Sequence, residues 1–170
     1  MTTLQNLLDA VVRVLLWLAG VALVAMMFVT IVDVVVRNFG EYIPVFREIR
    51  LYGILEVVRY LFLVSMAGTM PWGVEKSQVI VELFTQKLSN TARARVDSFF
   101  LLGFTVFGGF MAYALVLSGV HAINANETTP DLGLPMSWIR FFAAFCMGLM
   151  GLRALLIGIQ GLRRGELHVA

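Results

Sequence analysis

The residues of this chain that could do chemistry are few and widely spaced. The sequence has two histidines, His121 and His168, and one cysteine, Cys146. Neither histidine has a second ligand at a spacing that binds a metal or clamps a haem. A single cysteine forms no internal disulfide and no CxxC redox pair. The sequence also lacks a P-loop and a G-x-S-x-G turn. We therefore expect no catalytic centre and no cofactor, and interpret Cys146 as an apolar packing residue.

A second group of reactive side chains consists of charges inside or beside long apolar stretches. Asp33 and Arg37 are four residues apart, so they share a helical face on which they can pair. The candidate intramembrane ion-pair cluster is Asp33, Arg37, Glu56, Arg59 and Arg140. One hypothesis makes this cluster a relay for an ion or substrate. The interpretation we prefer is that the charges pair to fix the helix register or reach the lipid headgroups.

Arg153 lies deeper in an apolar stretch, where insertion of a charge costs at least about 2.5 kcal/mol. It either reaches back to the aqueous surface or meets a partner protein. Glycines recur around it with helical spacing, which lets another helix approach closely. The candidate helix-packing or subunit interface is Gly151, Arg153, Gly158, Gly161 and Gly165. Packing within the chain is preferred over a contact between subunits.

These residues must be positioned by membrane helices, because 59% of the 170 residues are hydrophobic and only 14% are charged. About 20 helical residues cross a hydrocarbon core of roughly 30 Å. The sequence therefore predicts an all-α integral membrane protein with four transmembrane helices, at about residues 7–36, 51–74, 96–123 and 136–162. Short amphipathic helices on the membrane surface are expected within 45–59 and 75–97, and residues 1–170 are expected to form a single domain.

The distribution of Lys and Arg favours an orientation with both termini in the cytoplasm. Residues 124–135 contain no Lys or Arg, whereas 75–97 contain four, and cytoplasmic loops are enriched in positive charge. The basic residues are scattered, so no nucleic acid partner is expected. The middles of the first, third and fourth predicted spans carry no carboxylate, which argues against a self-contained pump.

Several short motifs follow one another in a recognisable order. They are Arg37-Asn38-Phe39 at the end of the first span, Glu56 before Tyr60-Leu61-Phe62, Gln78 to Glu82 after the second span, Glu127 to Trp138 before the fourth, and Gly148 within it. In this order the chain resembles the DctQ-like family, the small membrane subunit of tripartite ATP-independent periplasmic (TRAP) transporters. The resemblance covers nearly the whole chain. Gln78 stands where the family usually has His, Cys146 stands where it usually has Pro, and Val45 to Gly53 looks like an insertion.

The resemblance implies a non-catalytic scaffold subunit in the inner membrane of a bacterium or archaeon. Its partners would be a large DctM-like membrane subunit that carries a small organic acid by an ion-coupled elevator movement, a periplasmic DctP-like binding protein, and membrane lipids. The candidate docking residues for the binding protein are Arg47, Glu48, Arg50, Glu127 and Asp131. Two alternatives remain, a self-contained four-helix exporter and a membrane anchor of another complex. The substrate and the coupling ion would be determined by the other chains.

Overall fold

The computed structural model describes residues 2–39, 53–76 and 90–164, with side chains for 6–38, 53–74 and 95–160. Its helices are α1 (Thr2–Phe39), α3 (Ile54–Lys76), α5 (Asn90–Asn124) and α6 (Met136–Arg164). Each contains an apolar segment long enough to cross a membrane, at Asn6–Asn38, Ile54–Val74, Arg95–Asn124 and Met136–Gln160. The predicted all-α class with four membrane-spanning helices is confirmed. The protein is a multi-pass membrane protein.

The surface helices expected within 45–59 and 75–97 fall mostly on residues 40–52 and 77–89, which lie outside the described residues. Residues 54–59 belong to α3. The second span therefore begins inside the charged stretch, close to the predicted start at about residue 51.

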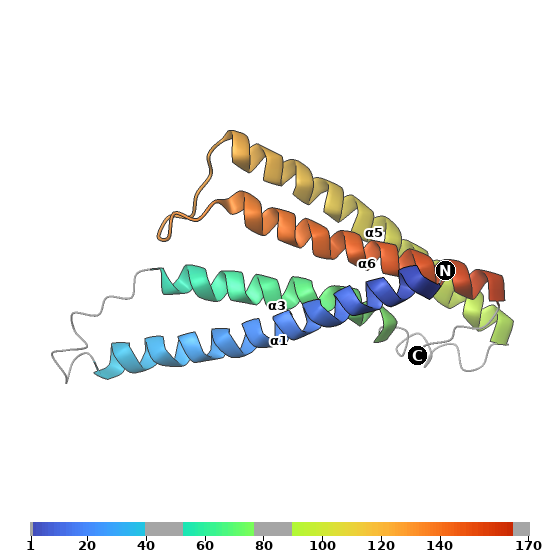
Figure 1. Ribbon diagram of the computed structural model, residues 1–170, viewed down its shortest axis with the longest axis horizontal. Helices are drawn as coiled ribbons and strands as arrows, with labels where there is room; N and C mark the ends of the chain where they lie inside the picture. Colours follow the sequence, from blue (N-terminus) through green and yellow to red (C-terminus); the bar gives the residue numbers. More distant parts are fainter. Residues whose placement is uncertain (1, 40–52, 77–89, 165–170) are drawn as a thin grey trace.

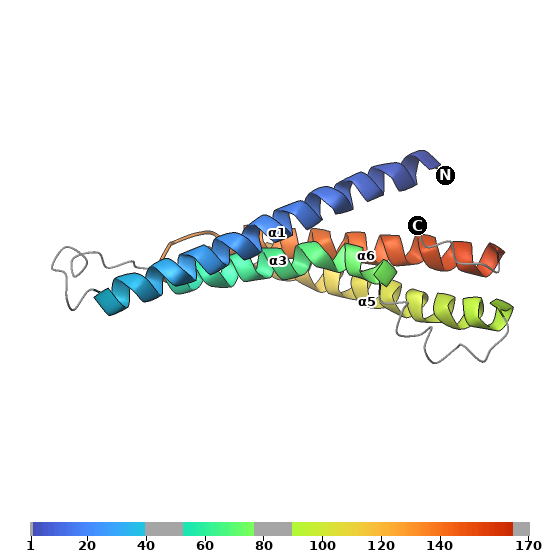
Figure 2. The same ribbon diagram turned by 90° about the horizontal axis from the view of Figure 1, so that it is seen from below.

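The four helices run alternately up and down and form two pairs (Figure 1). α1 lies beside α3, and α5 lies beside α6. α1 begins and α6 ends at one end of the molecule, whereas the loop between α5 and α6 lies at the other end, beside the start of α3. Seen from below, the first part of α1 leans away from the other helices (Figure 2).

A regular stripe of side chains runs along α1, and its members Leu15 and Ala19 meet α3. Its buried members recur in alternating steps of four and three residues: Leu8, Val12, Leu15, Ala19 and Ala22. This spacing is typical of a left-handed coiled coil, in which one face of each helix follows the other. At Gly68 of α3 an added Cβ would lie 3.1 Å from the Cβ of Ala19 and 3.1 Å from the carbonyl oxygen of Leu15, so the two backbones approach closely.

α5 and α6 meet through glycine. A Cβ added to Gly108 would lie 2.9 Å from the backbone of Gly151 and 2.9 Å from the carbonyl oxygen of Met147. Further along the pair, a Cβ added to Gly119 would lie 2.9 Å from the ring of Phe141. Small residues thus bring these helices together over several turns, as in other membrane helix pairs.

α6 joins the two pairs. One buried cluster combines Leu15 of α1, Ala67 of α3 and Cys146 of α6. A second combines Val74 of α3 and Leu101 of α5 with Met150 and Ala154 of α6. The outer faces of α1 and α5 remain apolar and exposed, as expected for surfaces that lipid or another membrane helix covers.

Candidate functional site

The most organised polar site lies where α3 begins. Gly53, with φ of +80°, turns the chain into the helix, and its carbonyl oxygen accepts from the amides of Glu56 and Val57 at 3.0 Å each. Glu56, only 5% exposed, turns its carboxylate toward the loop between α5 and α6. Its two oxygens accept from the backbone N–H of Asp131 at 2.9 Å and that of Leu132 at 3.0 Å.

The hydroxyl of Thr129 completes this site. Thr129 is buried and is hydrogen-bonded to the Glu56 carboxylate. Its oxygen also accepts from the backbone N–H of Leu134 at 3.1 Å. Thr129 therefore links the carboxylate to the loop backbone on both sides of the turn.

The loop itself is compact. The amide of Thr129 donates to the carbonyl of Leu134 at 2.9 Å, and that of Gly133, with φ of +65°, donates to the carbonyl of Thr129 at 3.1 Å. Thr128 and Pro135 form an isolated antiparallel bridge, and the Met136 amide donates to the carbonyl oxygen of Glu127 at 3.1 Å. Backbone groups of the loop thus bond to one another and form a closed turn.

Arg140, on the first turns of α6, fixes the other side of this loop. It donates to the carboxylate of Glu127 at 2.7 Å and to the carbonyl oxygen of Ser118 at 2.8 Å. Because a guanidinium carries several donors in a rigid plane, it can hold both partners at once. Arg140 thus ties the start of the loop to α5 and α6 together.

The structure distributes the five residues of the predicted ion-pair cluster over three arrangements. Asp33 and Arg37 pair within α1 at 3.1 Å. Glu56 bonds to the loop and is attracted electrostatically by Arg59 on the next turn. Arg140 pairs with Glu127, which sequence reasoning had assigned to docking. The prediction of local pairing between Asp33 and Arg37 matches the geometry, but the described contacts do not join the five residues into one cluster.

Arg153 finds a partner inside the chain. It donates to the carboxylate of Asp9 on α1 at 2.9 Å. The sequence had suggested that Arg153 reaches the aqueous surface or meets a partner protein, whereas this bond is to a residue of the same chain. Sequence reasoning did not identify Asp9, because 144 residues separate it from Arg153 and no spacing rule connects them. Thr129 was also missed, although it belongs to the Glu127 to Trp138 motif.

Two of the glycines predicted near Arg153, Gly151 and Gly158, lie in described parts of α6, and both pack against α5. Gly151 meets α5 at Gly108, and a Cβ added to Gly158 would lie 3.4 Å from the Cβ of Leu101. Gly161 lies in α6 beyond the described side chains, and Gly165 lies outside the described residues. Packing between α5 and α6 therefore accounts for two of the four glycines.

Only some of the candidate docking residues lie in the described part of the chain. Arg47, Glu48 and Arg50 lie outside the described residues. Asp131 is exposed on the loop, and its backbone N–H, not its side chain, is bonded to Glu56. Of the two described members of the predicted set, Glu127 is paired with Arg140, whereas Asp131 is exposed on the loop.

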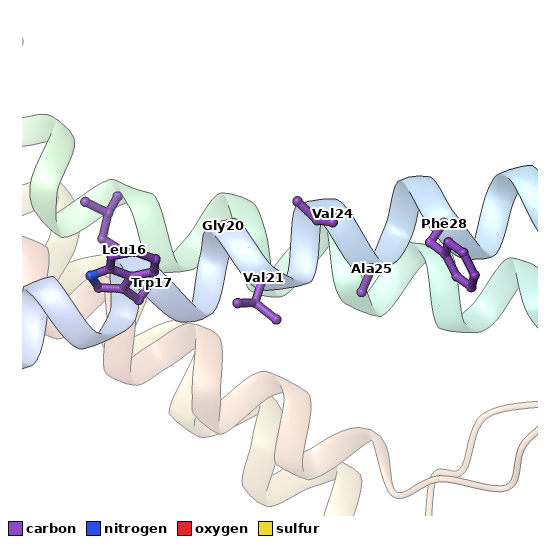
Figure 3. A pocket seen from close by; sticks show the side chains of 7 residues that line it. All are labelled: Leu16, Trp17, Gly20, Val21, Val24, Ala25 and Phe28. Carbon is purple, nitrogen blue, oxygen red and sulfur yellow. The ribbon is translucent and has the colours of Figure 1, made fainter.

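An open groove of about 730 Å³ runs along one face of α1 (Figure 3). It is lined by Leu16, Trp17, Gly20, Val21, Val24, Ala25 and Phe28. Its walls are apolar, so it can hold hydrocarbon or an apolar side chain but offers no group that transfers a proton or binds an ion. Over the described residues, no group of three or more His, Cys, Asp or Glu could hold a metal ion.

Comparison with known proteins agrees with this architecture. No curated protein and no solved structure matches the chain. The family described as the DctQ component of tripartite ATP-independent periplasmic transporters matches residues 26–164, which is well over half of the sequence. This confirms the resemblance seen in the motifs. The chain therefore belongs to the DctQ family, the small membrane component of TRAP transporters, and its four membrane-spanning helices agree with that membership.

Proposed function

We propose that this chain is a non-catalytic scaffold subunit that holds a large DctM-like subunit in place during uptake of a small organic acid. One observation carries the proposal. The charges that could have lined a transport pathway are instead bonded to protein groups: Glu56 to the loop backbone, Arg140 to Glu127 and Ser118, and Arg153 to Asp9. Charges used in this way fix the shape of a protein and are not available to move with an ion or substrate.

The same proposal includes an orientation. With both termini in the cytoplasm of a bacterial or archaeal inner membrane, the loop between α5 and α6 faces the periplasm. A DctP-like binding protein would meet this loop at Asp131, together with Arg47, Glu48 and Arg50. Charges at the rim of such a contact mainly set the encounter rate and the register. Ion coupling and substrate choice would then reside in the large subunit and the binding protein.

A self-contained four-helix exporter is supported less well. Such a carrier needs an ionisable group that water and substrate can reach inside the membrane. The described carboxylates of the membrane-spanning segments, Asp9, Asp33, Glu56 and Asp97, all lie toward helix ends, and Glu56 is closed off by the loop. A haem-anchoring subunit would need histidine pairs within the spans, whereas the described spans hold His121 alone, near the end of α5.

The test is reconstitution of the transporter in liposomes with and without this chain. The complete set of large subunit, binding protein and this chain should take up the organic acid under an ion gradient. Omission of this chain should abolish uptake or reduce it strongly. The chain by itself should show none. Saturable uptake by the lone chain, or full uptake in its absence, would contradict the scaffold role.

A further inference from the structure

Two motifs that are 75 residues apart in the sequence meet at one site. The acidic residue that opens α3, Glu56, bonds to the backbone of the loop formed by Glu127 to Pro135. We propose that Glu56 is a positioning residue for docking: it holds this loop in the shape that a soluble binding protein recognises. The proposal rests on the proposed function, since it requires that the loop face a periplasmic partner.

The contact is suited to fixing a backbone. Each carboxylate oxygen of Glu56 accepts from a different amide, that of Asp131 or that of Leu132, and Thr129 adds a hydroxyl. Hydrogen bonds to an ionised acceptor are shorter and stronger than those between neutral groups. The bonds also lie at a buried residue, where water competes less well. They therefore specify the path of the loop at two consecutive residues.

Packing reinforces the hydrogen bonds. The Leu132 side chain lies against Gly53, where an added Cβ would come within 2.9 Å of it. The loop is thus held by α3 beneath it and by Arg140 at its start. Because α3 belongs to the other helix pair, the loop also connects the two pairs at this end of the molecule (Figure 1).

The outward side of the loop has a composition that fits a protein partner. Residues 125–135 lie between the membrane-spanning segments of α5 and α6. Asp131 presents an exposed carboxylate, flanked by Pro130, by Leu132 at 40% exposure and by Leu134 at 47% exposure. A negative charge among apolar side chains on a fixed backbone complements a basic side chain in an apolar patch. The partner we infer is a soluble protein with such a patch.

Two variants of Glu56 compare the loss of both carboxylate oxygens with the loss of one. Glu56→Ala removes both acceptors. Glu56→Gln keeps the size and one acceptor, but brings an NH2 donor against an amide donor. Thr129→Val removes the hydroxyl bonded to the carboxylate. The matched control is Thr69→Val on α3, whose hydroxyl bonds only to the carbonyl oxygens of Ser65 and Met66 within its own helix.

Uptake by the complete transporter is measured against the concentration of binding protein. We expect the concentration of binding protein that gives half-maximal uptake to rise about threefold to tenfold for Glu56→Gln and Thr129→Val. A loop that is not held in place must be ordered when the partner binds, and the free-energy cost of that ordering weakens binding by about this factor. Glu56→Ala should be affected more strongly. The maximal rate and the amount of assembled complex should change little, and Thr69→Val should behave like the wild type.

A spin label on Pro130→Cys reports the loop directly, since Cys146 is fully buried and should not react. With Glu56 in place, we expect the label to be immobile. With Glu56→Gln, we expect it to be mobile. In both proteins a water-soluble relaxation agent should reach the label. A loop that stays immobile in every Glu56 variant would overturn the proposal. A loop that loosens without any change in the half-maximal concentration would also overturn it. Oxygen dissolves in lipid, so a label that oxygen reaches and the aqueous agent does not would place the loop inside the membrane. That result would also overturn the proposal.

These failures differ from failure of the proposed function. If uptake continues when this chain is omitted, the scaffold role is wrong regardless of the Glu56 variants. If omission abolishes uptake while the Glu56 variants keep normal docking kinetics, the scaffold role stands and only the positioning role is wrong.

Discussion

The guanidinium of Arg153 donates a hydrogen bond to the carboxylate of Asp9 over 2.9 Å, and so joins α6 to α1. The Arg153 side chain is 10% exposed, whereas that of Asp9 is 49% exposed. Asp9 lies in the first turns of α1, and Arg153 lies in the second half of α6. Leu8 and Val12, which are close to Asp9 in α1, are buried, so the ion pair lies beside packed apolar side chains.

Removing Asp9 should therefore loosen α1. An exposed ion pair is worth at most about 1 kcal/mol, while breaking a buried one costs about 3–5 kcal/mol. Because only the arginine is buried, we expect Asp9→Asn to lower the free energy of unfolding by about 1–2 kcal/mol, between these limits. The measurement is reversible unfolding in mixed detergent micelles, with Arg153→Gln and the double variant completing a mutant cycle.

The cycle isolates the interaction between the two residues. A coupling energy of about zero would mean that Arg153 is stabilised by its other contacts and that the bond to Asp9 is incidental. Asp33→Asn provides a comparison, because its ion pair with Arg37 lies within one helix. Pairs of that kind contribute only about 0.3–0.5 kcal/mol.

Gly108 should tolerate no side chain. In Gly108→Ala the new Cβ would lie 2.9 Å from backbone atoms of Gly151 and Met147, which cannot rotate away as a side chain can. α5 and α6 would have to separate, at a cost of about 1–3 kcal/mol in the free energy of unfolding. The neighbouring Gly109 is the control, because a Cβ there meets nothing within 4 Å. Equal stability of Gly108→Ala and Gly109→Ala would show that the helices do not approach this closely.

Arg140→Lys tests whether the planar guanidinium is needed. Lysine keeps the charge but has no rigid fork to reach both the Glu127 carboxylate and the Ser118 carbonyl. We expect a loss of about 1–3 kcal/mol in the free energy of unfolding, comparable to one hydrogen bond that involves a charged group. Arg140→Met should lose more, because Glu127 keeps its charge without its partner. If Arg140→Lys is as stable as the wild type, charge alone would explain the contact.

Hydropathy and charge predicted what depends on local sequence. Four apolar segments of membrane-spanning length, the start of α6 at Met136 and the i,i+4 pair of Asp33 and Arg37 all follow from composition or helical spacing. The motifs predicted the family. The residues that hold distant segments together were not predictable in this way. Glu56 and Arg153 were recognised as charges that need a partner, but their partners, the loop amides and Asp9, depend on how the helices pack.

Orientation in the membrane stays a prediction, and thiol labelling tests it. Asp131→Cys places a thiol on the loop between α5 and α6, and Ser89→Cys places one just before α5, outside the described residues. Since positively charged loops stay in the cytoplasm, a membrane-impermeant thiol reagent added to intact cells should label Asp131→Cys and not Ser89→Cys. After the cells are opened, both should be labelled.

The unmodified chain provides the background for this experiment. Cys146 is 0% exposed and contributes to the cluster shared by α1, α3 and α6, so it should stay unlabelled in the folded protein. Labelling of Ser89→Cys but not Asp131→Cys from outside would reverse the topology. The loop held by Glu56 would then face the cytoplasm, where no periplasmic binding protein could reach it.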